Sequence, residues 1–153
     1  MEIERKFLVE GLGDLEGLDA VAIEQGYLAP ATEGGAEVRL RRKGDDLVLT
    51  IKGGTGEVRV EEELELGREQ FDSLWPLTEG RRLSKTRHLV PLDGLTAEID
   101  VYEGELEGLV VVEVEFSSEA DADRFEPPEW FGRELTGDDR YSNERLAVEG
   151  RPS

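Results

Sequence analysis

The stretch that decides the fold is residues 37–52, which read EVRLRRKGDDLVLTIK. Charged and apolar residues alternate on both sides of a Gly44-Asp45 turn, a pattern typical of two antiparallel strands joined by a hairpin. Arg39 and Arg41 face the same way, because successive side chains of a strand point to opposite faces. The stretch therefore predicts a hairpin with one apolar face and one charged face.

The same alternation continues along most of the 153-residue chain. It predicts eight strands, at Met1–Val9, Ala22–Ala29, Glu37–Lys43, Asp46–Lys52, Glu57–Leu66, Arg82–Val90, Thr96–Tyr102 and Leu109–Phe116. Short helices are expected at Arg68–Trp75, Ser118–Phe125 and near Ser142–Ala147. Short turns between strands favour an antiparallel meander or barrel. We predict a mainly β fold: one domain over residues 1–153, built as a closed eight-stranded antiparallel β-barrel with a few peripheral helices. The C-terminal helical segment, about residues 118–150, is expected to pack on the barrel or plug it.

Composition excludes several classes of partner. The chain has 37 acidic and 18 basic residues, a net charge of −19, which argues against a broad basic face for duplex nucleic acid or an anionic membrane. It has no cysteine, which excludes disulfides and cysteine nucleophiles and fits the cytoplasm. No apolar run is long enough to cross a bilayer, and no export leader is evident. Whether the protein is a monomer or a homodimer is left open.

The charged faces of the strands form an unusual set. On any single strand, a solvated sheet face is the ordinary interpretation. Here, however, like charges lie two residues apart, which is unfavourable on an exposed face, and three of the four lysines of the chain belong to the set. The seven bases are Lys6, Arg39, Arg41, Lys52, Arg59, Lys85 and Arg87. The eight acids are Glu2, Glu4, Glu61, Glu63, Glu98, Asp100, Glu113 and Glu115.

If these faces line a barrel, the lumen carries a net charge of −1 and the rest of the chain carries −18. Buried charges are costly unless they are paired, so such a lumen needs a polyanion for its bases and hard cations for its carboxylates. Clustered carboxylates suit Mg²⁺ or Mn²⁺. A small polyphosphate bound together with a divalent metal satisfies both halves of the set.

These motifs resemble the CYTH domain, the triphosphate tunnel metalloenzyme family. Its opening signature matches Glu2-Ile3-Glu4-Arg5-Lys6, and the resemblance continues along nearly the whole chain. Further matching segments are residues 25–28, 37–41, 50–52, 59–63, 79–87, 98–100, 112–116 and the tail at 130–147. Short bacterial members imply metal-dependent hydrolysis of inorganic tripolyphosphate inside a β-barrel tunnel.

The resemblance also implies roles for individual residues. The metal is expected on Glu2, Glu4 and Glu115, and Lys6 near the reacting phosphoryl group. The phosphate chain is expected on Arg39, Arg41, Lys52, Lys85 and Arg87, with Arg59 as a further candidate. Five further acids would position bases, hold a second metal or orient the attacking water: Glu61, Glu63, Glu113, Glu98 and Asp100. Tyr27 contacts a lumen charge such as Lys6 or packs under a loop.

Three alternatives stay open. The same tunnel could act as a thiamine triphosphatase or as an adenylyl cyclase, although aromatic residues make up 7% of the chain and offer few stacking surfaces. The chain could instead bind polyphosphate or nucleotide without hydrolysis. It could also be a salt-adapted structural barrel that neither binds nor hydrolyses.

Overall fold

The computed structural model describes residues 3–11, 13, 15–29, 36–55 and 58–152. Within these residues, nine strands form one antiparallel sheet in the order β5-β4-β3-β2-β6-β7-β8-β1-β9. The strands are β1 (Ile3–Val9), β2 (Ala20–Ala29), β3 (Glu37–Lys43), β4 (Asp46–Thr55), β5 (Val58–Glu65), β6 (Arg82–Leu92), β7 (Leu95–Tyr102), β8 (Val110–Phe116) and β9 (Phe131–Glu134). The predicted mainly β fold is confirmed, and the predicted strands correspond to β1–β8.

The closed eight-stranded barrel is not confirmed. Among the described residues, β5 pairs with β4 alone and β9 with β1 alone, so the sheet is open. β9 occupies the edge of β1 that a closed barrel would give to β5, through pairing of Phe7 with Glu134 and of Val9 with Phe131. Alternation along a strand defines its two faces, but it does not define which edges pair, so it could not establish closure.

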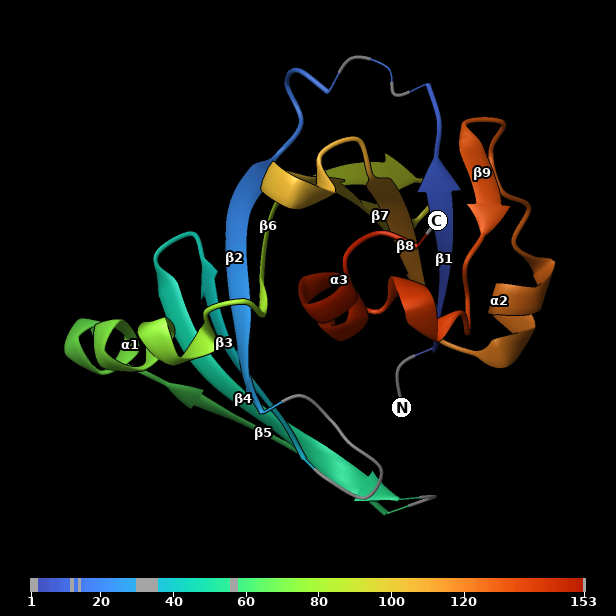
Figure 1. Cartoon of the computed structure of the whole chain (residues 1–153). Coiled ribbons are helices and arrows are strands. Elements are labelled where there is room, and N and C mark those ends of the chain that lie inside the picture. The colour runs from blue at the N-terminus through green and yellow to red at the C-terminus, as the bar shows by residue number, and fades with distance from the viewer. Residues whose placement is uncertain (1–2, 12, 14, 30–35, 56–57, 153) are drawn as a thin grey trace.

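Six short helices accompany the sheet in the described residues. They are α1 (Arg68–Leu74), η1 (Trp75–Thr78), η2 (Gly104–Leu106), α2 (Glu119–Arg124), η3 (Asp139–Tyr141) and α3 (Asn143–Glu149). The sheet curves around α3, whereas α1 lies outside the curve beside β2 and β3, and α2 lies near β1 and β9 (Figure 1). No helix in this part of the chain is long and apolar enough to span a bilayer.

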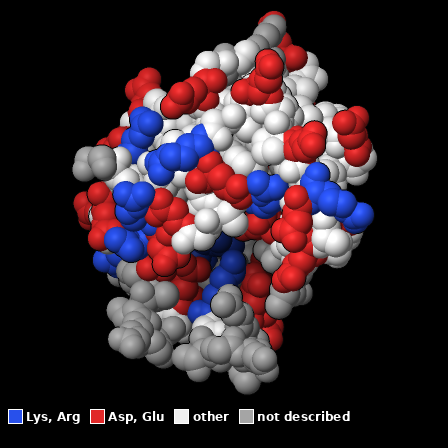
Figure 2. Space-filling model, turned by 90° about the vertical axis from the view of Figure 1, so that its right-hand side faces the viewer, with Lys and Arg blue, Asp and Glu red and all other residues white. Residues whose placement is uncertain are grey.

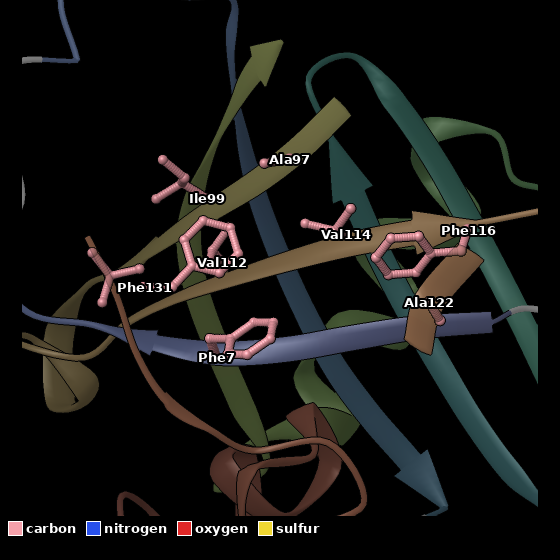
Figure 3. Packing of buried hydrophobic residues seen from close by; sticks show 9 residues of the cluster. Phe7, Ala97, Ile99, Val112, Val114, Phe116, Ala122 and Phe131 are labelled. Atoms are coloured by element: carbon pink, nitrogen blue, oxygen red, sulfur yellow. The ribbon is translucent and has the colours of Figure 1, made fainter. Parts of the chain in front are cut away.

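The main apolar core lies on the outer face of the sheet, the face that carries Phe7, Val112 and Phe116. Phe7 meets Phe131 of β9 with ring centroids 5.0 Å apart, and Ala122 of α2 packs close by (Figure 3). Burying these side chains against α2 and β9 removes apolar surface from water. Their charged neighbours along β1, β7 and β8 are thereby directed to the opposite, inner face.

A second apolar cluster closes one end of the inner face. Leu146 of α3 packs there against Leu83, Tyr102 and Val111 of three neighbouring strands. The Ser142 side chain caps α3 by accepting a hydrogen bond from the backbone N–H of Arg145 at 3.2 Å. The C-terminal segment therefore covers the apolar end of the inner face and leaves the charged part beside it.

Candidate active site

Strand register brings the predicted charged residues onto the inner face. Residues directly opposite each other in an antiparallel pair lie on the same face. Arg39 on β3 lies opposite Tyr27 on one side and Thr50 on the other, and Lys52 lies opposite Glu37 and Glu61. One half of the sheet therefore presents two cations and a phenol next to each other.

The other half of the sheet adds a row of alternating charge. Glu113 on β8 lies opposite Lys6 on β1 and Glu98 on β7. Further pairs on this face are Arg87 with Asp100, Lys85 with Tyr102, Glu4 with Glu115, Arg41 with Gln25 and Glu63 with Thr50. Glu2 lies outside the described residues. For Arg59 the structure describes the backbone alone, opposite Gly54.

A cavity of about 600 Å³ opens on the inner face. Six residues expected at the site line it: Glu4, Lys6, Tyr27, Arg39, Lys52 and Glu113. Six other residues of the charged set lie on the same face but do not line this cavity: Arg41, Lys85, Arg87, Asp100, Glu61 and Glu63. Glu98 and Glu115 instead line a second cavity of about 500 Å³. In Figure 2, basic side chains lie inside a hollow bordered by acidic ones.

Much of the cavity wall comes from the tail, which the site prediction had not included. The lining residues from the tail are Leu135, Thr136, Gly137, Asp138, Asp139, Ser142, Asn143, Glu144 and Arg145, and Glu37 of β3 also lines the cavity. The tail carries helix-capping residues, which sequence analysis assigns to local structure. Its contribution to a binding site follows from its docking on the sheet and has no separate sequence signal.

Lys6 of β1 contacts both the C-terminal tail and the neighbouring strand β8. Its ammonium group donates a hydrogen bond to the backbone carbonyl oxygen of Tyr141 at 2.6 Å and lies 3.7 Å from a carboxylate oxygen of Glu113. Its side chain is 15% exposed, so it remains accessible from the cavity that it lines. Lys6 is therefore fixed beside the cavity with its charge partly unbalanced.

Behind the cavity, Asp100 joins two cations. Its carboxylate accepts hydrogen bonds from Lys85 Nζ at 2.8 Å and from Nε and Nη2 of Arg87 at 2.8 and 3.0 Å. Burial opposes ionisation of Asp100, but Arg87 and Lys85 outweigh it and lower the pKa of Asp100. Burial lowers the pKa of Lys85 to about 8, and the charge of Arg87 lowers it further, although Asp100 acts to raise it. For Arg87 burial is outweighed by Asp100, and its pKa is raised.

Tyr27 is a protonated hydroxyl group at neutral pH. Burial raises the pKa of Tyr27 to about 12, although the positive charge of Arg39 opposes the rise. The same burial, together with the charges of Arg39 and Arg87, lowers the pKa of Arg41 to about 10, so Arg41 remains a cation at pH 7. The cavity is thus lined by a hydroxyl donor and cations, the groups that phosphate oxygens bind.

The carboxylates on β1, β7 and β8 fit a hard cation. Glu4 lies opposite Glu115, and Glu98 lies opposite Glu113. Like charges in opposite positions destabilise a sheet unless something balances them. Among the described residues, no three acidic or histidine side chains converge into a complete metal group. The oxygen donors present suit Mg²⁺ or Mn²⁺, which bind few protein carboxylates and retain water ligands.

The fold and the site together define a curved antiparallel sheet whose inner face gathers cations and carboxylates around a cavity. A sequence model of the CYTH domain matches residues 1–143. The chain therefore belongs to the CYTH domain family.

Two relatives match nearly the whole chain. An inorganic triphosphatase of Nitrosomonas europaea is 49% identical over 148 residues, which are 96% of this chain and 97% of the relative. An inorganic triphosphatase of Acetivibrio thermocellus is 39% identical, over 95% of this chain and 92% of the relative. The crystal structure of an inorganic triphosphatase superposes with a TM-score of 0.80 at 45% identity, covering 99% of this chain and 97% of the other.

Proposed function

We propose that the protein is a divalent-metal-dependent triphosphatase that hydrolyses inorganic tripolyphosphate to pyrophosphate and phosphate. The observation that carries the proposal is the cavity of about 600 Å³, where Lys6, Arg39 and Lys52 lie beside the carboxylates of Glu4 and Glu113. The near full-length similarity to two inorganic triphosphatases supports the same substrate class.

The cations of the cavity bind and orient the phosphate chain. Arg39 and Lys52, from neighbouring strands, bind the non-reacting phosphates, and the Tyr27 hydroxyl donates to a phosphate oxygen beside them. Lys6 places its charge at the terminal phosphoryl group. Lys85 is 0% exposed, so we assign it and Arg87 to supporting the charge of the site from behind the cavity.

Carboxylates complete the chemistry. Glu4 and Glu115, together with Glu2, are proposed to hold Mg²⁺ or Mn²⁺. When bound, the metal supplies charge neutralisation for the phosphate oxygens and lowers the barrier to attack. A water molecule attacks the terminal phosphorus in line with the leaving oxygen, the new P–O bond forms as the bridging P–O bond breaks, and pyrophosphate leaves. Glu113, near Lys6, is placed to orient this water, with Glu98 next to it.

The acids of β5 are given a positioning role. Glu61 lies 3.6 Å from the ammonium group of Lys52, so it holds this cation against the neighbouring strand. Glu63 lies opposite Thr50, one step further along the same face. We place the enzyme in the cytoplasm, a reducing compartment that suits a chain without cysteine.

The test is a phosphate-release panel with tripolyphosphate, ATP and thiamine triphosphate, each with Mg²⁺, Mn²⁺ or Ca²⁺. We expect tripolyphosphate with Mg²⁺ or Mn²⁺ to be hydrolysed fastest. Glu4→Gln should abolish turnover without unfolding the protein, whereas Glu105→Gln, at an exposed acid in η2, should not change it. Preferential hydrolysis of thiamine triphosphate, formation of cyclic AMP, or tight binding without phosphate release would overturn the proposal in favour of the corresponding alternative.

A further inference from the structure

Gln25 is a buried polar side chain on the inner face for which the proposed mechanism has no role. It is 0% exposed and lies on β2, opposite Arg41 of β3 and Leu83 of β6. Burying an amide is costly unless each of its polar atoms has a hydrogen-bond partner. The two partners of Gln25 are both residues of the site.

The orientation of the Gln25 amide is determined by Arg41. The Nε of Arg41 donates to Gln25 Oε1 at 3.3 Å, and a guanidinium group has donors but no acceptor. The atom that faces Arg41 must therefore be the carbonyl oxygen. The amide nitrogen is left to face Tyr27, where it donates to the hydroxyl oxygen at 3.0 Å.

This second hydrogen bond determines what Tyr27 can do. Because its hydroxyl oxygen accepts from Gln25, the hydroxyl proton cannot point at Gln25 and is free to be donated elsewhere. Tyr27 lines the cavity with Arg39 and Lys52, so an anion bound there is an available acceptor for this proton. The phenol also keeps this proton at neutral pH, since its pKa is raised to about 12 by burial.

We propose that Gln25 is a positioning residue that makes Tyr27 a hydrogen-bond donor to the bound phosphate chain while it holds Arg41 in place. The identity of the anion as tripolyphosphate rests on the proposed function. The positioning role of Gln25 does not rest on it, because this role requires only that some anion binds in the cavity. Gln25 acts through Tyr27 and Arg41, and it is not itself a lining residue of the cavity.

Two substitutions separate this role from simple packing. Gln25→Leu keeps a similar volume and removes both hydrogen bonds. Gln25→Glu keeps an acceptor for Arg41, but a carboxylate accepts from Tyr27 instead of donating, so it turns the hydroxyl proton away from the cavity. We expect either change to raise KM for tripolyphosphate about tenfold, the effect of losing one good hydrogen bond, with kcat changed less than threefold.

A double-mutant cycle with Tyr27→Phe provides the decisive readout. In the Phe background the hydroxyl is absent, so the uncharged change Gln25→Leu should alter KM by less than about twofold. An equal effect of Gln25→Leu in both backgrounds, or an unchanged KM in both Gln25 variants, would overturn the proposal. Gln70→Leu, at the exposed glutamine of α1, is the matched control and should leave KM and kcat unchanged.

Calorimetric binding of tripolyphosphate keeps this test independent of turnover. If the parent protein hydrolyses no substrate, the proposed function fails, yet a weaker Kd in Gln25→Leu than in the parent would still support the positioning role. Equal Kd values in a folded Gln25→Leu variant would refute it. If Gln25→Leu does not fold, Gln25→Met, a flexible side chain of similar length, takes its place in the cycle.

Discussion

Asp100 and Arg87 form a two-pronged ion pair in which the carboxylate accepts from Nε at 2.8 Å and from Nη2 at 3.0 Å. The same carboxylate accepts from Lys85, so one negative charge is shared between two cations, of which Arg87 also pairs with Glu98. Both oxygens of Asp100 are occupied by cations. These contacts favour a role for Asp100 in holding Arg87 and Lys85. They do not favour the alternative expectation that Asp100 binds a second metal.

Replacing Asp100 by asparagine should strongly destabilise the protein. The variant keeps the shape of the side chain but leaves the buried Lys85 without its counter-charge and Arg87 with Glu98 alone, which costs about 3–5 kcal/mol of unfolding free energy. Urea unfolding measures the loss. Glu98→Gln is the control, since Glu98 pairs with Arg87 from a side chain that is 32% exposed and should cost about 0–1 kcal/mol. Equal losses in the two variants would contradict the buried network.

The stability contributed by Lys85 should increase with pH. The pKa of Lys85 is lowered to about 8 in the folded protein from its ordinary value of 10.5. Between these values the unfolded chain binds a proton that the folded protein has released, so the free energy of unfolding rises with pH. The Lys85→Met variant has no titrating group at this position, so its stability lacks this contribution to the pH dependence.

Urea unfolding of the parent and of Lys85→Met at several pH values measures the effect. The stability of the parent relative to the variant should rise from pH 8 to pH 10.5. Titration of Tyr27, whose raised pKa acts in the opposite direction from about pH 10 upward, is common to both proteins and cancels in the difference. A difference that does not change with pH would show that Lys85 ionises normally in the fold.

Truncating Leu146 should weaken both the fold and the site. Leu146 is 2% exposed in the apolar cluster under α3, and Leu→Ala at such a position costs about 2–5 kcal/mol. Because α3 lines the cavity, we also expect a higher KM for tripolyphosphate. Val148→Ala, in the same helix at a side chain that is 46% exposed, should change stability and KM little. A loss of stability with no change in KM would separate the helix from substrate binding.

Gly26 allows β2 and η1 to approach closely, and alanine should not fit there. An added Cβ would lie 2.6 Å from Thr78 Oγ1 and 2.7 Å from Thr78 Cβ. Thr78 cannot easily move, because its hydroxyl donates to the carbonyl of Trp75 and accepts from Arg82. We expect Gly26→Ala to cost about 1–3 kcal/mol in thermal or urea unfolding.

Gly53 provides the matched control for this substitution. A Cβ at Gly53 would lie 3.5 Å from the Cβ of Ala36, an ordinary van der Waals contact. Gly53→Ala should therefore leave stability nearly unchanged. If both variants unfolded at the same denaturant concentration, the close approach at Gly26 would not be a constraint on the fold.

Alternation along the strands carries most of the information that sequence provides about this fold. Arg39, Lys52 and Glu113 could each be placed on a charged face because their neighbours at the next position are apolar and are drawn to the other side. The pattern also predicted each of the strands β1–β8. It could not reveal β9, whose four residues are too few to show a period and which is defined by its contact with β1.

Some residues of the site could not be predicted from the sequence, and the reason differs from the one for β9. The carbonyl oxygen of Tyr141 that holds Lys6 belongs to the backbone, and every residue has such an atom. Asn143 and Glu144 enter the cavity wall because α3 docks on an apolar cluster, and the expectation that the tail packs on or plugs the barrel does not specify which of its residues line a cavity. In the sequence, Gln25 is an ordinary polar residue of a strand. Its partners become evident only when β2 and β3 are placed in register.

The hydrogen bond from Lys6 to Tyr141 spans 135 positions of the chain. All nine described strands end by Glu134, so a ribosome will have translated the whole sheet before it adds the segment at 135–145 that completes the cavity wall. A product of premature termination at Asp138 would carry the cations and acids of the inner face, yet it would lack the rest of that wall and the carbonyl partner of Lys6. Under the proposed function, a stop codon in this segment would therefore abolish hydrolysis although nearly all of the protein had been synthesised.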